Sequence, residues 1–364
     1  MTTAIEEKIQ QAIGQGVFPG AQCLVASGEE VLFESSQGRT SSERGAAEVT
    51  PATFFDVASL TKPIVTTSAL LLLMHREKIR LDARVVDFLP DFDEGGKNKI
   101  TLRHLLKHTS GLAAWRPYFE EMRRSQPEIV GTSAARGWVL SRICQEELEI
   151  PTGYRRLYSD LGFMLLGELV ERISGIRLDR FFANEVCQPL GLRGSFFNPL
   201  GDQAPEAEGA VFAATEDCPW REKVLVGEVD DDNAYAMGGV AGHAGLFQTA
   251  RDCHLFVGAL LKALRGEGSF FSPDLLMDLI GPRHKIKGGW DTPSPENSQA
   301  GRYFSPQSIG HLGFTGCSLW IDLGQNFHII LFTNRIHPSR NNEKIKEWRP
   351  LFHDIAYETI IRKS

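Results

Sequence analysis

The sequence predicts an α+β fold in which both ends of the chain share one antiparallel sheet and the middle forms a mostly helical insertion. Three observations lead to this prediction. Strand-like runs occupy residues 21–38 near the N-terminus, and a second set occupies residues 317–334 near the C-terminus. Between them, helical periodicity prevails over residues 67–227. We therefore expect residues 1–66 and 228–364 to form one α/β subdomain, with residues 67–227 as a mostly helical subdomain.

The N-terminal segment begins with a short amphipathic helix, because apolar side chains recur at helical spacing in "AIEEKIQQAI". Two strand-like runs follow, "AQCLVAS" and "EVLFESSQG", and residues 28–30 join them, beginning with a glycine. Such a short, glycine-containing connection is typical of a β-hairpin. The hairpin is expected to supply two strands of the sheet.

The middle of the chain carries three further helix signals. "TLRHLLKHTSGL" predicts a helix that ends in a turn. "DLGFMLLGELVERISG" predicts an amphipathic helix with Gly175 just past its end, where a C-terminal glycine is favoured. "LDRFFANEVCQPLGL" predicts another helix, closed by a proline.

From about residue 228 the chain changes to glycine-rich loops and strands. "TARDCHLFVGALLKAL" predicts a helix with Thr249 as its N-cap, and a long loop follows at residues 289–306. "CSLWIDLG" and "NFHIILFTN" predict two central strands. "NEKIKEWRPLFHDIAYETIIR" predicts a terminal helix.

Composition and charge exclude several classes of protein. The net charge is −7 and no Lys/Arg cluster occurs, so nucleic-acid binding has no electrostatic support. The six cysteines are widely spaced without a C-x-x-C pair, which predicts reduced, mostly buried thiols and no metal site. The opening residues lack the apolar core of a signal peptide, and no apolar run is long enough to cross a membrane. We expect a cytoplasmic protein without cofactors or membrane contact; its oligomeric state stays open.

A serine and a lysine stand three positions apart at the head of the apolar segment "DVASLTKPIVTTSALLLLM". On a helix this spacing brings Ser59 Oγ and Lys62 Nζ together. Pro63 is tolerated only in a first turn, so Ser59 lies at or just before the helix start, where free N–H groups favour developing negative charge. The apolar run after Lys62 is expected to desolvate the ammonium group and lower its pKa. A lysine with a lowered pKa is a usable base, and a serine beside a base is a nucleophile.

One S-x-x-K match of this kind is expected roughly once by chance in a chain of this composition. Two more motifs follow it in order. Tyr158-Ser159-Asp160 comes directly before an amphipathic helix, and His311-Leu312-Gly313 lies at the edge of the C-terminal strand pair. The order S-x-x-K, Y-x-[ND], [KH]-x-G resembles the serine β-lactamase and penicillin-binding-protein superfamily. It is most similar to the class C-like branch, which includes class C β-lactamases, DD-peptidases, D-aminopeptidases and β-lactamase-like carboxylesterases.

This resemblance spans nearly the whole chain and implies a single β-lactamase/transpeptidase-like catalytic unit. It implies that Ser59 is acylated, that Lys62 shares a proton network with it, and that Tyr158 acts as general base and then as acid. Because a tyrosine normally titrates near 10, a nearby ammonium must stabilise its phenolate.

The resemblance also implies an oxyanion hole built from the backbone N–H groups of Ser59 and Phe314. Gly313 would let the strand backbone approach the substrate. His311 would line the pocket, and its part in proton transfer stays open.

Each of these residues also has a structural interpretation. Taken alone, "YSD" is more typical of an aromatic residue at a helix start, and a lone histidine is more often structural than catalytic. His104, His108 and His243 lie beside turns and are expected to hold loops by hydrogen bonds; they lack metal-ligand spacing. The run of aspartates at residues 230–232 suggests a cation, but a solvated or capping loop near the cleft is the favoured interpretation.

Two positions depart from relatives that bind anionic substrates, which usually carry asparagine and lysine there. Asp160 adds negative charge, and His311 is mostly neutral at pH 7. Both changes favour a neutral ester or amide substrate and a carboxylesterase-like serine hydrolase. A His-x-Gly motif also occurs in DD-peptidases, so His311 alone does not decide the substrate class. The alternative is a β-lactamase, D-Ala-D-Ala carboxypeptidase or D-aminopeptidase. An inactive homologue that serves as a binding module is a third hypothesis, disfavoured because all the motif residues are present.

Overall fold

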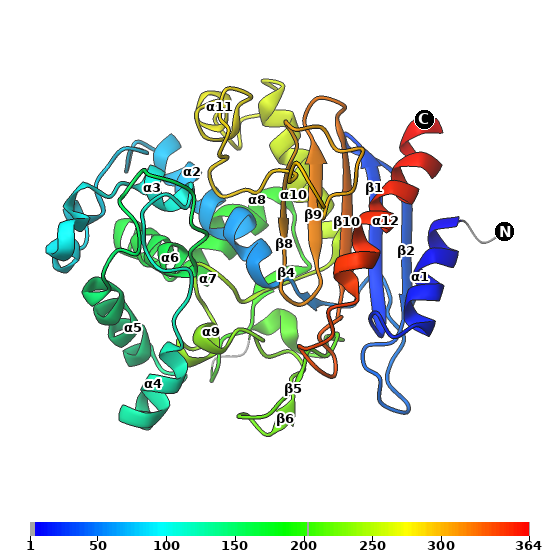
Figure 1. Cartoon of the computed structure of the whole chain (residues 1–364), viewed down its shortest axis with the longest axis horizontal. Coiled ribbons are helices and arrows are strands. Elements are labelled where there is room, and N and C mark those ends of the chain that lie inside the picture. The colour runs from blue at the N-terminus through cyan, green and yellow to red at the C-terminus, as the bar shows by residue number, and fades with distance from the viewer. Residues whose placement is uncertain (1–3, 202–203, 364) are drawn as a thin grey trace.

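The computed structural model describes residues 4–201 and 204–363. Its centre is a five-stranded antiparallel sheet with the strand order β2-β1-β10-β9-β8 (Figure 1). The N-terminal hairpin joins the C-terminal strands because β1 pairs with β10. The prediction that both ends of the chain share one sheet is therefore confirmed. The strands are β1 (Gly20–Ser27), β2 (Glu30–Gly38), β8 (Ile309–Leu312), β9 (Ser318–Asp322) and β10 (Phe327–Thr333).

Both faces of this sheet are buried, which explains the nearly continuous apolar runs of its central strands. Successive side chains of a strand point to opposite faces. On β1, Cys23 and Val25 join one apolar cluster, and Leu24 and Ala26 join the other.

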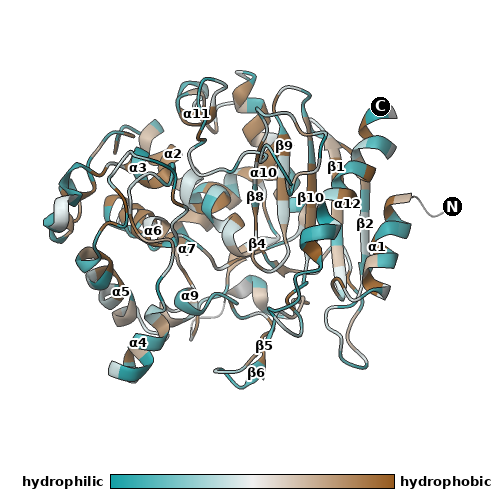
Figure 2. Cartoon of the chain, in the orientation of Figure 1, coloured by the Kyte–Doolittle hydropathy of each residue, from teal (hydrophilic) through white to brown (hydrophobic). Residues whose placement is uncertain are grey.

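Helices from the two ends of the chain cover one face of the sheet. The helices α1 (Ala4–Gly14) and α12 (Ile345–Thr359) contact each other on that face (Figure 1). Their ribbons alternate between hydrophilic and hydrophobic residues, as amphipathic helices do (Figure 2). On the other face, α10 (Ala250–Leu264) contacts β1 and β10, and Thr249 caps its first turn as predicted.

The remaining helices lie mainly on the side of the molecule away from α1 and α12 (Figure 1). Gly175 ends α6 in the left-handed conformation, as predicted, and Thr101 forms a capping box with His104 at the start of α3. These helices are α2 (Ser68–His75), α3 (Leu102–Leu106), α4 (Tyr118–Ser125), α5 (Ser133–Gln145), α6 (Asp160–Ser174), α7 (Leu178–Phe182), α8 (Gln188–Leu190), α9 (Asp232–Ala236) and α11 (Pro273–Ile280). Shorter 3-10 and π turns are η3 (Val85–Asp87), η4 (Pro90–Lys99), η5 (Pro127–Ile129), η6 (Ala183–Cys187), η7 (Pro205–Ala207) and η8 (Ile361–Lys363).

Residues 67–227 contain three short strands besides their helices: β4 (Ser195–Phe197), β5 (Asp217–Cys218) and β6 (Lys223–Val224). A small sheet in the order β3-β7-β4 joins β4 to β3 (Phe55–Asp56) through β7 (Leu246–Gln248). This sheet links the predicted insertion to the rest of the chain, so the division into two subdomains stays a prediction.

All six cysteines are free and buried, as the sequence predicts. Within the described residues, no helix combines the length and apolar character that a membrane span requires.

Candidate active site

Ser59 lies in a tight turn between the small sheet and the apolar helix. The turn is the 3-10 segment η1 (Ala58–Leu60), and the π-helical segment η2 (Lys62–Thr67) follows it before α2 begins. Ala58 has a φ of 47°, a left-handed conformation that costs about 1–3 kcal/mol for a residue with a side chain. Its N–H donates to Asp56 Oδ1 over 2.8 Å, and its carbonyl accepts from Thr61 Oγ1 over 2.6 Å. Strained turns and π segments cluster at functional sites.

Lys62 is fully buried and directs its ammonium group at three acceptors. Its Nζ lies 2.8 Å from Ser59 Oγ, 2.9 Å from the carbonyl oxygen of His243 and 2.8 Å from Asp160 Oδ1. The first two contacts are hydrogen bonds and the third is an ion pair, and together they suit the protonated lysine. The spacing of S-x-x-K thus produces the predicted contact between serine and lysine.

The expected lowering of the Lys62 pKa was wrong. Burial does lower it, but the charges of Asp160 and Tyr158 and their hydrogen bonds outweigh burial, and the net effect raises the pKa of Lys62. The sequence predicts that Asp160 adds negative charge to the substrate cleft. The ion pair instead balances that charge with the charge of Lys62.

Tyr158 lies against this pair, with its ring centre 5.2 Å from Lys62 Nζ. Burial raises the pKa of Tyr158 to about 12, although the positive charge of Lys62 and hydrogen bonds with Lys62 and Ser59 lower it. The predicted stabilisation of the phenolate by an ammonium group is present, but burial is the larger effect.

His108 packs against Tyr158 and bonds to the neighbouring backbone, in agreement with the expectation that it holds a loop by hydrogen bonds. The two rings stack with centroids 4.5 Å apart. His108 Nδ1 accepts the backbone N–H of Ser159 over 3.0 Å, which leaves the ring proton on Nε2. Burial holds the pKa of His108 well below its usual value, so the ring is neutral.

The third motif lies on β8, the edge strand next to the nucleophile turn. His311 is buried, and its Nδ1 donates to the carbonyl of Leu312 over 2.9 Å. Its Nε2 therefore carries a lone pair, and that atom has no hydrogen-bond partner among the described residues. Burial lowers the pKa of His311, so this position presents a neutral acceptor rather than a cation.

Gly313 lets the backbone of β8 approach the nucleophile turn. A Cβ at this position would lie 2.5 Å from the carbonyl oxygen of Val57, too close for any side chain. The next residue, Phe314, is held by Arg335, which donates to its carbonyl over 2.6 Å. The ring of Phe314 is half exposed. The segments that carry the two predicted oxyanion donors, Ser59 and Phe314, are thus packed closely together.

Gly313→Ala is expected to lower kcat/KM by about 100-fold, because the added methyl group would push the Phe314 amide away from the nucleophile turn. Steady-state kinetics and circular dichroism of the folded variant are the measurements. Gly324→Ala is the matched control, since a Cβ there meets only Asp322 Oδ1, at 3.5 Å. Equal activity of the two variants would show that the close approach at Gly313 does not matter for the reaction.

The aspartates at residues 230–232 are buried or half-buried, so the expectation of a solvated loop was wrong. The expectation of a capping loop is confirmed, because Asp231 caps α9 by accepting the N–H of Ala234 over 2.8 Å. Asp231 also lies 2.9 Å from Nε2 of His243. His243 is the residue whose carbonyl accepts from Lys62, so Asp231 helps to position the lysine's acceptor.

One group of possible metal ligands occurs among the described residues: Glu216, Cys218 and Asp232. Arg340 pairs with Glu216 and Asp232, and Arg221 lies 3.0 Å from Asp232. Because two guanidinium groups already balance these carboxylates, the arrangement fits a buried ion-pair network better than a cation site.

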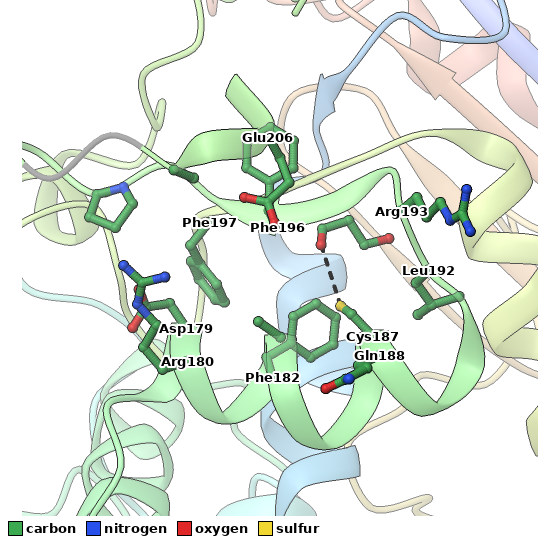
Figure 3. A pocket seen from close by; sticks show the side chains of 14 residues that line it. Asp179, Arg180, Phe182, Cys187, Gln188, Leu192, Arg193, Phe196, Phe197 and Glu206 are labelled. Atoms are coloured by element: carbon green, nitrogen blue, oxygen red, sulfur yellow. Dashed lines mark hydrogen bonds and ion pairs between the residues drawn. The ribbon is translucent and has the colours of Figure 1, made fainter. Parts of the chain in front are cut away.

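A separate pocket of about 300 Å³ lies between α7, η6 and β4 (Figure 3). Phe182 and Phe196 line it, together with Cys187, whose thiol donates to the carbonyl of Ser195 (Figure 3). Burial raises the pKa of Cys187, which keeps the thiol protonated and unreactive. This pocket contains none of the motif residues.

The fold is that of the β-lactamase/transpeptidase-like serine hydrolases. The family model described as Beta-lactamase matches residues 5–350, and the chain belongs to this family.

Two curated relatives and one solved structure illustrate the range of the family. The chain is 30% identical over 369 residues to N-acetylmuramyl-L-alanine amidase of Bacillus subtilis (strain 168), covering 92% of this chain and 80% of that protein. It is 29% identical over 362 residues to a putative D-alanyl-D-alanine carboxypeptidase of Escherichia coli (strain K12), covering 90% and 81%. The structure of EstCE1, a hydrolase with promiscuous acyltransferase activity, superposes with a TM-score of 0.71 at 22% identity, covering 95% of this chain and 97% of that one.

Proposed function

We propose that the protein hydrolyses an ester or amide through an acyl-enzyme formed on Ser59. The observation that carries this proposal is the contact of 2.8 Å between Ser59 Oγ and the ammonium group of a fully buried lysine. A buried charge is costly unless it is paired, and here its partners are the nucleophile and Asp160. The retention of all these groups supports an enzyme over an inactive binding module.

In the proposed reaction, Tyr158 in its phenolate form accepts the proton of Ser59 as Oγ bonds to the substrate carbonyl carbon. The carbonyl oxygen becomes an oxyanion that accepts hydrogen bonds from the backbone N–H groups of Ser59 and Phe314. Tyr158 then returns its proton to the leaving alkoxide or amine, and the acyl-enzyme remains. Water attacks the acyl group by the reverse roles and releases the acid.

Lys62 stays protonated throughout this proposed cycle. Its raised pKa and its position beside Tyr158 support a role as the cation that stabilises the phenolate. The phenolate is a minor species at neutral pH, because the pKa of Tyr158 is about 12. Acylation is therefore expected to accelerate as pH rises above neutrality.

The neutral state of His311 supports a neutral, carboxylesterase-like substrate. Its Nε2 lone pair would accept a hydrogen bond from a substrate N–H or O–H and would repel a carboxylate. The balance of charge between Lys62 and Asp160 leaves no net cation at the nucleophile.

A second candidate is an amide or β-lactam that carries a carboxylate, and one observation favours it. Arg156 pairs with Asp291 and lies near enough to the site that its charge lowers the pKa of both His108 and His311. A substrate carboxylate could compete with Asp291 for this guanidinium. The relatives named as an amidase and as a carboxypeptidase agree with this candidate.

The two candidates are separated by kcat/KM for p-nitrophenyl butyrate, nitrocefin and a diacetylated Lys-D-Ala-D-Ala peptide. We expect the ester to have the highest value. His311→Lys adds a cation to the site and should raise the ratio of nitrocefin to ester by about tenfold, an effect that salt would reduce. His75→Lys adds the same charge at the exposed end of α2 and should leave the ratio unchanged. A wild-type preference for the peptide or for nitrocefin would overturn the assignment to neutral substrates.

A further inference from the structure

Asp56 is a buried carboxylate next to the nucleophile turn with no role so far in the reaction. It ends β3, and it is 2% exposed. Its Oδ1 accepts the N–H of Ala58 over 2.8 Å, and its Oδ2 accepts the N–H of Asp230 over 2.7 Å. The side chain therefore holds the strained residue that directly precedes Ser59.

The backbone of Asp56 also holds the opposite side of the proposed oxyanion hole. Its carbonyl accepts from Thr315 Oγ1 over 2.7 Å and lies 3.7 Å from Cys317 Sγ. Thr315 follows Phe314, the second proposed donor. Asp56 is thus bonded on one side to the turn that carries the Ser59 amide and on the other to the segment that carries the Phe314 amide.

We propose that the ionised carboxylate of Asp56 is a positioning residue for the oxyanion hole, and that its protonation slows acylation of Ser59. This inference rests on the proposed function. Both carboxylate oxygens accept backbone N–H groups, and these charge-assisted bonds are stronger than bonds to a neutral carboxyl group. Protonation therefore weakens them, most of all at the oxygen that carries the proton, and loosens either the Ala58 turn or the Asp230 loop.

The surroundings of Asp56 put this protonation within a measurable pH range. Burial raises the pKa of Asp56 to about 6, while hydrogen bonds from the N–H groups of Asp230 and Ala58 lower it. Asp231 raises the pKa by its negative charge and Arg221 lowers it. Asp230, whose own pKa is raised by burial, and the protonated thiol of Cys317 are the other titratable neighbours. Because the ionised form is the competent one, the contribution of Asp56 to the rate is present above about pH 6 and is lost as pH falls below it.

The test is the second-order rate constant for labelling of Ser59 by a fluorophosphonate between pH 4.5 and 8. In the wild type we expect a fall of about tenfold per pH unit between pH 8 and 6, which follows the phenolate fraction of Tyr158, and a steeper fall of about a hundredfold per unit below 6, where Asp56 also becomes protonated. Asp56→Asn keeps one acceptor but turns an N–H donor toward another N–H. We expect it to label at least about tenfold more slowly at pH 7.5 and to lack the steeper fall below pH 6.

Asp322→Asn is the matched control, because Asp322 is fully buried and accepts the backbone N–H groups of Ser305 and Gln325 at the far end of β9. Asp322→Asn should lose thermal stability but keep the wild-type pH profile. If the role of Asp56 were purely structural, Asp56→Asn would show the same two results. A normal rate, or a retained steepening below pH 6, in Asp56→Asn overturns the inference. If that variant fails to fold, a wild-type profile whose slope does not steepen between pH 6 and 4.5 overturns it. Wild-type protein that is not labelled on Ser59 at any pH contradicts the proposed function itself.

Discussion

Ser59→Ala will reduce kcat/KM by about 10⁴-fold or more with the best ester substrate, while the fold stays intact. The hydroxyl is the group that forms the acyl bond, and nothing else at the site replaces it. Its removal leaves Lys62 with two acceptors, the carbonyl of His243 and Asp160, so the buried ammonium stays paired. The thermal midpoint should therefore change little, and the kinetic loss will report on chemistry rather than on unfolding.

Ser42→Ala is the stringent control for this prediction. Ser42 Oγ lies 3.0 Å from Nε2 of His337, whose Nδ1 donates to the carbonyl of Thr215. This is a second serine beside a possible base, on the exposed surface. Ser42→Ala should retain normal activity. Loss of turnover in that variant, with Ser59→Ala active, would show that Ser42 and not Ser59 is the nucleophile.

Lys62→Ala and Tyr158→Phe will each cost about 10³-fold in kcat/KM, and the double variant will cost about the same as either one. The reason is that the two groups act as one unit: Tyr158 transfers the proton, and the positive charge of Lys62 stabilises the phenolate form of Tyr158. Removing either group removes the function of both. Independent contributions would instead multiply to about 10⁶-fold in the double variant.

The pH dependence of the wild type and of Tyr158→Phe tests whether Tyr158 acts as a phenolate base. Because the pKa of Tyr158 is raised to about 12, the phenolate fraction, and with it the wild-type acylation rate, should rise with pH through the neutral range. The residual activity of Tyr158→Phe should lack this rise. Gln325 accepts from the exposed Tyr357 hydroxyl, remote from the site, so Tyr357→Phe serves as the control and should retain it. Additive losses, or an unchanged pH profile in Tyr158→Phe, would contradict the coupled model.

Much of the fold could be predicted because its main elements carry long, unambiguous patterns. The apolar strands around Leu24 and Ile330 and the capped helix ending at Gly175 are examples. The small sheet could not be found in this way. Strands of two or three residues, such as β3 and β7, are too short for alternation to be visible.

The proximity of the motif residues could be predicted from the sequence, but their electrostatics could not. The motifs identify Ser59, Lys62 and Tyr158, yet the sign of the Lys62 pKa shift depends on a carboxylate that only folding brings to 2.8 Å. Asp160 is the first residue of α6, two positions after Tyr158, and its carboxylate contacts Lys62. Asp56 could not be predicted, since a single aspartate at the end of a two-residue strand carries no recognisable signal.

The central claim is that Ser59 becomes covalently acylated, and intact-mass analysis of the protein after treatment with a fluorophosphonate tests it most directly. We expect a mass increase of one phosphonyl group per chain, which peptide sequencing should map to the peptide that contains Ser59. The increase should be absent from folded Ser59→Ala. Equal labelling of Ser59→Ala, or a label on Ser42 in place of Ser59, would contradict it.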